Sequence, residues 1–393
     1  MDKVFDKPLK YMIKTHLLYH NSIDDYFGHK EPSMKRWLTY WSKNLLLFIL
    51  LVRFGLLSLQ SNLNEYNIFR DASILLGDQA HIFHLFGFIL YLVTLCLKLS
   101  IFYYESKYKM NFLVLLSNYQ AQTPFYKLNL AHRKSIKNKS NLLYYAYMRG
   151  LASLSSILAH CVLFGLSVYA QVNFEVNIII YWLTFLLFFP AIFDLLSVVL
   201  NGPFIFYLPI MIINYKLDEL VNILKACILL RNDQAIDKFL SSYHHLTIII
   251  KQISGLYNMI IGIVYCVVSY TIAIMLQISQ IERDDLIFKT IKYFAYFGLI
   301  VTNINAYLIN RISASITVRN KAIPRLLYPI FINNNIIDLR LKLRIDSFID
   351  RLHNQYIGFY CFNLFKFTKM AFYQYIFTVS SCYILVAGFA KNM

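Results

Sequence analysis

The stretch that decides the fold runs from Ile357 to Ala390 and reads IGFYCFNLFKFTKMAFYQYIFTVSSCYILVAGFA. From Met370 to Ala390 it carries no charged side chain over about 21 residues, enough for a helix to span a hydrocarbon core of about 30 Å. The hydroxyls of Thr378, Ser380 and Ser381 fall near its midpoint. The segment predicts a final membrane helix. It either lines a pore or bundle core, or packs as an anchor in which small residues allow close approach.

Composition extends this prediction to the whole chain. Of its 393 residues, 58% are hydrophobic and 15% are charged, and the mean hydropathy is +0.50. A soluble protein would carry about 25% charged residues. The chain is therefore predicted to be a polytopic, all-α membrane protein. The net charge of +17 comes from Lys and Arg beside apolar segments, which favours the positive-inside rule over nucleic-acid binding.

Seven apolar segments are candidates for membrane spans, preceded by a cytoplasmic N-terminal segment at 1–44. We expect the spans, which form one domain over 45–393, at about 45–60, 80–104, 150–172, 177–214, 253–279, 288–310 and 366–390. The fourth is too long for one upright helix. Its last part, after Gly202-Pro203, is too short to cross a bilayer, so the pattern favours one kinked helix over a hairpin.

The distribution of basic residues sets the orientation. The N-terminal segment and the three connections on its side of the membrane carry 28 Lys and Arg, whereas the three opposite connections carry two. This asymmetry predicts a cytoplasmic N-terminus and an extracellular C-terminus in the plasma membrane. Apolar residues at helical spacing in 217–250 and 341–356 predict amphipathic cytoplasmic helices that form an anchor layer, where we expect subunit contacts.

Motifs for catalysis are absent from the sequence. It has no nucleotide-binding glycine loop, no nucleophile elbow and no zinc-protease helix, and its six cysteines show no metal-site spacing. We therefore expect neither an enzyme nor a cofactor nor a metal site.

Aromatic residues point to a different kind of site. The chain has 31 Tyr and 32 Phe, and the outer halves of spans two to six hold many aromatic and hydrogen-bonding side chains. Such a set can line a cavity for a small organic ligand; the alternative is a packed aromatic bundle without a cavity. The candidate ligand-binding residues are Phe83, His84, Tyr169, Tyr181, Trp182, Tyr270, Tyr293 and Tyr296.

The inverted topology, the long helical connection between spans four and five, and the final span together resemble the arthropod gustatory and odorant receptor superfamily. In that family the final helix carries Thr-Tyr, five mostly apolar residues and Gln-Phe. Here Cys382-Tyr383 and Phe389-Ala390 stand at those positions, so only the tyrosine is kept. The chain is identified as a divergent member, with taste and odour both open.

The resemblance implies a tetrameric, ligand-gated, non-selective cation channel whose pore is lined by the last helix of each subunit. It places an apolar gate at Val386 and a pore position at Phe389, where a large ring would narrow the pore. The implied pore and gate residues are Cys382, Tyr383, Val386, Phe389 and Ala390. The implied partners are a tastant or odorant, membrane lipid, and identical or related receptor subunits in a homo- or heterotetramer.

Two other functions remain open at this point. A non-conducting or auxiliary subunit that requires a channel-forming partner is supported by the unusual Phe389. A transporter is disfavoured because the chain has no internal repeat with paired, interrupted helices.

Overall fold

The computed structural model describes about two thirds of the chain. Described are residues 12–13, 17–59, 80–121, 127–143, 207–229, 233–280, 286–332, 338–354, 357–361, 365–366 and 370–391, with single positions between them. The predicted spans at 150–172 and, for the most part, 177–214 lie outside these residues.

The described residues are helical except for loops and one pair of two-residue strands. The elements are α2 (Ile23–Phe27), α3 (Met34–Leu59), α4 (Ala80–Ser106), α5 (Asn111–Gln120), α6 (Leu130–Leu143), a helix over 207–229, α9 (Asp233–Gln280), α10 (Leu286–Asn320), α11 (Ala322–Ile332), α12 (Leu339–Asn354), β1 (Tyr360–Cys361), β2 (Phe365–Lys366) and α13 (Ala371–Lys391). The predicted all-α membrane fold is confirmed.

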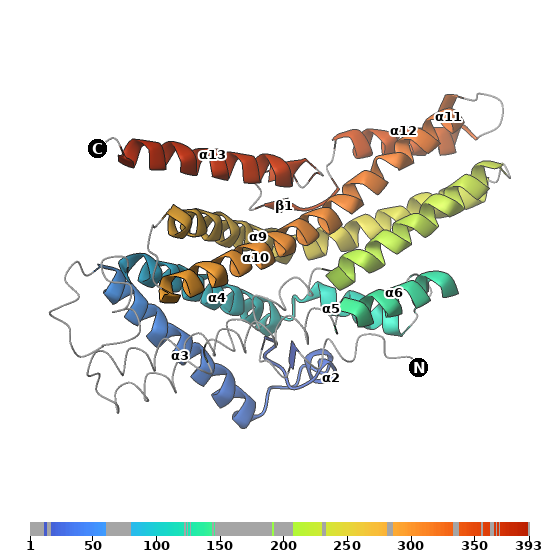
Figure 1. The fold of residues 1–393 in the computed structure, drawn as a ribbon. Coiled ribbons are helices and arrows are strands. Elements are labelled where there is room, and N and C mark those ends of the chain that lie inside the picture. Colours follow the sequence, from blue (N-terminus) through green and yellow to red (C-terminus); the bar gives the residue numbers. More distant parts are fainter. Residues whose placement is uncertain are drawn as a thin grey trace.

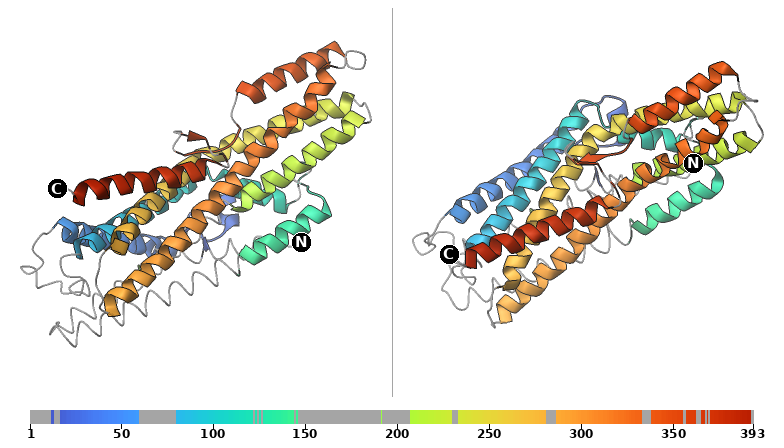
Figure 2. Two further views of the ribbon diagram at one scale, coloured as in Figure 1. Left: turned by 45° about the horizontal axis from the view of Figure 1, so that its top comes forward. Right: turned by 90° about the horizontal axis from the view of Figure 1, so that it is seen from above.

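The molecule is elongated, and its two ends are built from different helices (Figure 1). One end holds α3, α4, α13 and the adjoining halves of α9 and α10, and the other holds α6, α11, α12 and the helix over 207–229 (Figure 2). Three described segments are long and apolar enough to cross a membrane: Met34–Leu59, Gly87–Ser106 and Asp233–Ile263. The number of spans and their orientation stay predictions.

Helix α9 joins the two ends without a break. It has 48 residues, so it is about 72 Å long at about 1.5 Å per residue. No proline interrupts it, and apolar residues recur along its length. The second part of the predicted amphipathic segment, from Asp233, and span five are therefore one helix, whereas the first part of that segment lies in the helix over 207–229.

An aromatic cluster closes the end of the bundle that the sequence predicts to be cytoplasmic. The ring of Tyr243 on α9 packs against Phe348 on α12 with centroids 5.1 Å apart. The Tyr243 hydroxyl donates to Oδ1 of Asn320 at 2.9 Å, and Nδ2 of Asn320 donates to the Ile357 carbonyl at 3.2 Å. These contacts tie α9, α10 and α12 together, and the predicted amphipathic helices are found packed here.

The N-terminal segment is more structured than the sequence indicates. Helix α3 begins at Met34, well before the predicted start of the first span at 45. The buried carboxylate of Glu105 on α4 accepts hydrogen bonds from the backbone N–H groups of Tyr19 (2.7 Å) and His20 (2.8 Å), and Nδ1 of His20 lies 2.7 Å away. Arg36 donates to the carbonyl oxygens of Leu18 (2.6 Å) and Tyr19 (3.3 Å). Residues 18–20 of this segment are therefore fixed to α3 and α4.

A second contact fixes α2 to the start of α5. The Tyr26 hydroxyl accepts a hydrogen bond from the backbone N–H of Met110 at 3.0 Å. Burial raises the pKa of the Tyr26 hydroxyl, although the Met110 N–H acts in the opposite direction. The hydroxyl is therefore neutral at neutral pH and binds α5 without a buried charge.

Helices α3 and α4 pack closely because each has a glycine at the contact. A Cβ atom added at Gly87 would lie 2.7 Å from the ring of Phe54, and one added at Gly55 would lie 3.1 Å from the ring of Phe88. The Phe54 ring is itself stacked on Tyr91, with centroids 5.4 Å apart and planes 19° apart. Phe54 therefore has little room to move aside.

We expect Gly87→Ala to lower the free energy of unfolding by about 1–3 kcal/mol, because overpacking forces neighbouring rings off their rotamers. Gly255→Ala is the matched control: its added Cβ would meet only the Tyr104 hydroxyl at 3.8 Å. It should be neutral or stabilising by up to about 1 kcal/mol through helix propensity. Thermal unfolding of the purified variants compares the two, and equal melting temperatures would contradict the close approach at Gly87.

Candidate ligand and pore sites

A short hairpin leads into the last helix. Strands β1 and β2 pair antiparallel, with Tyr360 opposite Lys366, and the Tyr360 N–H donates to Oδ1 of Asn258 on α9 at 2.9 Å. Helix α13 then begins at Ala371, whose N–H donates to the Thr368 hydroxyl at 3.2 Å. The final helix therefore begins after Lys366, where the sequence placed the start of the span, because residues 365–366 pair as a strand.

One tyrosine fixes α13 to α9. The rings of Tyr375 and Tyr265 have centroids 4.4 Å apart, and the Tyr375 hydroxyl contacts both the Ser269 hydroxyl and the Tyr265 carbonyl oxygen. The Tyr265 hydroxyl in turn donates to Oδ1 of Asn310 on α10 at 3.3 Å. The last helix, α9 and α10 are thus linked by a chain of polar contacts in an apolar environment.

Sequence reasoning missed this link. Tyr265 and Ser269 are four residues apart and so share one face of a helix, which was a detectable signal. Tyr375 carries no such signal, because nothing distinguishes it from the other tyrosines until its partner helix is known.

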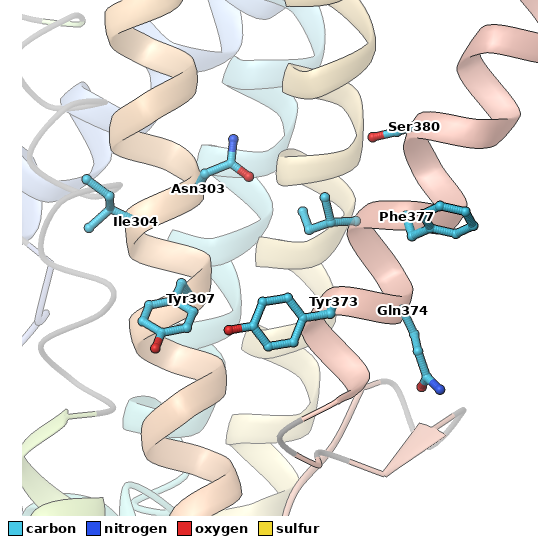
Figure 3. Close-up of a pocket in the computed structure, with 8 residues that line it drawn as sticks. Asn303, Ile304, Tyr307, Tyr373, Gln374, Phe377 and Ser380 are labelled. Atoms are coloured by element: carbon cyan, nitrogen blue, oxygen red, sulfur yellow. The ribbon is translucent and has the colours of Figure 1, made fainter.

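A groove lies between α10 and α13 (Figure 3). Its volume is about 840 Å³, and its walls are mostly apolar. It is lined by Asn303, Ile304 and Tyr307 on α10 and by Tyr373, Gln374, Ile376, Phe377 and Ser380 on α13. The Tyr373 hydroxyl points across it toward the ring of Tyr307 (Figure 3). The groove is large enough for a small organic molecule, an acyl chain or a side chain of another subunit.

The predicted ligand-binding residues are spread over several helices. His84 is buried in the contact between α3 and α4, where its ring lies 5.9 Å from that of Phe54, and Phe83 precedes it on α4. Tyr270 lies on α9, five residues beyond Tyr265. None of these residues lines the groove between α10 and α13.

The other predicted ligand-binding residues divide into two groups. Tyr293 and Tyr296 lie on α10 and are 73% and 38% exposed. Tyr169, Tyr181 and Trp182 lie outside the described residues. A common aromatic cavity therefore stays a prediction.

The predicted pore residues all lie in the second half of α13. Cys382, Val386 and Phe389 follow one another at four and three residues, so their Cα atoms share one face of the helix. Tyr383 and Ala390 lie on the same helix. The helical setting is as predicted, and the direction in which these side chains face stays a prediction.

Large apolar side chains of α13 are uncovered in the single chain. Tyr373, Phe377 and Ile384 are 57%, 75% and 68% exposed, respectively. Helix α13 packs against α9 and α10 with its other side. In a membrane, such a surface contacts lipid or further subunits.

The comparisons with known proteins identify the fold. No family model matches the chain, and no curated protein matches it. Among solved structures, the insect olfactory receptor OR5 from Machilis hrabei in complex with eugenol matches with a TM-score of 0.69 at 10% identity, over 91% of this chain and 90% of that chain. A second structure of the same receptor matches with a TM-score of 0.67 at 11% identity, over 90% of this chain and 89% of that chain. The chain has the fold of these receptors.

Proposed function

We propose that this chain is a chemosensory receptor of the gustatory and odorant receptor superfamily that acts as a ligand-gated, non-selective cation channel, and not as an enzyme. The observation that carries the proposal is the fold shared with an olfactory receptor along nine tenths of both chains. The sequence resemblance, which rests on the topology and on Tyr383, supports the same family independently.

The proposed ligand is a small organic tastant or odorant. The solved Machilis receptor is in complex with eugenol, which is a small aromatic molecule. In this chain the ligand would bind among the aromatic residues predicted in the outer halves of the spans, of which His84 and Tyr270 are buried or half-buried in the structure. Aromatic walls with a few hydroxyl groups suit such a molecule.

The proposed pore is lined by α13 from each of four subunits. Two features support this: α13 is free of charge from Ala371 to Ala390, and its exposed apolar side chains are uncovered in one chain. The Val386 side chains of the four subunits would form an apolar gate. When they move apart, water enters the pore and ions can pass. The channel would lie in the plasma membrane, with its N-terminus in the cytoplasm.

Gating would follow a shift in population between closed and open states. A ligand that binds the open state more tightly moves the equilibrium by its difference in affinity for the two states. The contact of Tyr375 with Tyr265 and Ser269 would hold α13 against α9 in the closed state, so that movement of α9 releases α13.

A second candidate function is an auxiliary subunit that does not conduct alone. Phe389 favours it, since a phenylalanine stands where the family has a polar pore residue. Four such rings would narrow the pore.

We expect whole-cell recordings from cells that express the chain to show a ligand-dependent cation current when pooled sugars, bitter compounds and volatile organic molecules are applied. Val386→Ala should raise the current measured without ligand severalfold. Four alanine side chains around the pore exclude water less well than four valines. The control is Ile49→Ala on the exposed side of α3, away from α13 and its groove, which should leave basal current unchanged. Surface labelling verifies expression, and silence of wild type and Val386→Ala at the cell surface would favour the auxiliary subunit.

A further inference from the structure

A second groove lies between α9 and α12, far from the pore residues. Its volume is about 660 Å³. The polar and charged residues that line it are Ser241, His244, Thr247 and Lys251 on α9 and Arg340, Arg344, Ser347 and Arg351 on α12. Leu240, Ile248, Leu343, Leu352 and the ring of Phe348 form part of its walls.

The basic residues that line this groove form two facing stripes, one on each helix. On α12, Arg340, Arg344 and Arg351 are separated by four and seven residues, which places them on one side of the helix. On α9, His244 and Lys251 are separated by seven residues and also share a side. Both stripes line the same groove, and no Asp or Glu is among its lining residues.

Two of the three arginines keep their charge without an ion pair in the described part of the chain. Arg344 forms an ion pair with Asp237. The described residues provide no ion pair for the guanidinium groups of Arg340 or Arg351, which are exposed. Like charges that face each other across a groove repel, and the repulsion is relieved by a bound anion.

The chemistry of the groove selects the class of anion. Arginine binds phosphate through two parallel N–H donors, and lysine adds a point charge. The hydroxyls of Ser241, Thr247 and Ser347 can donate further hydrogen bonds. The stripe from Arg340 to Arg351 extends about 16 Å along α12, longer than one phosphate can cover.

We propose that the groove between α9 and α12 binds a polyanion that carries several phosphate groups. Lys251 lies just before the predicted start of span five, so this end of the groove is at the level of the inner headgroups. The phosphates therefore come either from a phosphoinositide headgroup in the inner leaflet or from a soluble inositol polyphosphate. Both sources present the same chemistry to the arginines.

The site would regulate the channel through α9. The same helix lines the groove near His244 and contacts Tyr375 of α13 at Tyr265. This regulatory consequence rests on the proposed function, whereas binding itself does not.

The test measures binding by the purified full-length protein, in two arms. In the first, inositol hexakisphosphate is titrated against the protein in nanodiscs of phosphatidylcholine. In the second, nanodiscs with and without phosphatidylinositol bisphosphate are compared by thermal unfolding and by competition with the soluble probe. Binding in the first arm alone identifies a soluble ligand, and stabilisation by the lipid with displacement of the soluble probe identifies the headgroup.

The decisive variant is Arg340→Gln/Arg351→Gln, which removes two exposed charges. We expect it to weaken binding at least about tenfold, since a charge-assisted hydrogen bond contributes roughly that factor. The control is Lys321→Gln/Arg325→Gln, which removes the same charge from exposed positions outside the groove and should change affinity less than about twofold.

Three results would overturn the proposal. The first is that wild-type protein binds neither probe, and the second is that both double variants lose affinity equally. The third is that the groove variant breaks up an oligomer while the polyanions have no effect. The last result would assign the groove to a subunit contact. Because no current is recorded, failure here is distinct from failure of the proposed channel function.

Discussion

Glu105→Ala should release the N-terminal segment from the membrane helices and lower the free energy of unfolding by about 3–5 kcal/mol. The carboxylate is 1% exposed and accepts hydrogen bonds from the Tyr19 and His20 N–H groups and from the His20 ring. Alanine would leave these buried donors without their acceptor, and the cost of unpaired buried groups exceeds the value of an ordinary hydrogen bond. Thermal unfolding and tryptic cleavage at the exposed Lys30 and Lys35 measure the effect.

Two variants bracket this result. Glu105→Gln keeps one carbonyl acceptor and should lie between wild type and alanine in melting temperature. Glu31→Ala removes an exposed carboxylate from the same segment and should change stability by less than about 0.5 kcal/mol. If Glu105→Ala melts and resists trypsin as Glu31→Ala does, the segment does not depend on the carboxylate.

Tyr375→Phe should shift the gating of the proposed channel toward the open state. The change removes one hydroxyl, and with it the contacts to the Ser269 hydroxyl and the Tyr265 carbonyl, while the ring can still pack on Tyr265. If these contacts hold α13 in the resting position, their loss of about 1 kcal/mol or more lowers the half-maximal ligand concentration roughly fivefold to tenfold. Dose–response recordings with the ligand found by the screen measure it, and basal current should rise as well.

A double-mutant cycle separates this link from a general effect of substitution in α13. Ser269→Ala removes the other hydroxyl of the same contact, so Tyr375→Phe in the Ser269→Ala background should have a smaller effect than in wild type. Additive shifts in the half-maximal concentration would show that the two hydroxyls act independently. The link would then be no path from α9 to α13.

The sequence predicted those parts of the fold that depend on local pattern. The uncharged run from Met370 predicted α13, which begins at Ala371, and the helical spacing in 217–250 predicted helices that lead into the fifth span. Charge and hydropathy patterns are properties of neighbouring residues in the sequence, so they can be recognised without knowing any contact between distant residues. The all-α membrane class followed from them.

Contacts between distant parts of the chain could not be predicted in this way. Glu105 binds His20 across 85 residues, and Tyr375 contacts Ser269 across 106. Periodicity shows which side of a helix is buried but not which helix covers it.

The unbroken course of α9 restricts how this protein can change in evolution. A helix turns by about 100° per residue, so inserting or deleting one residue between Tyr243 and Tyr265 would rotate one of them away from its partner. Substitutions leave that angular relationship intact. Selection must preserve the number of residues between these two positions of α9, rather than the identity of the residues between them. The fold is shared with a solved receptor at 10% identity, whereas a single-residue length change in this helix would separate Tyr243 or Tyr265 from its partner.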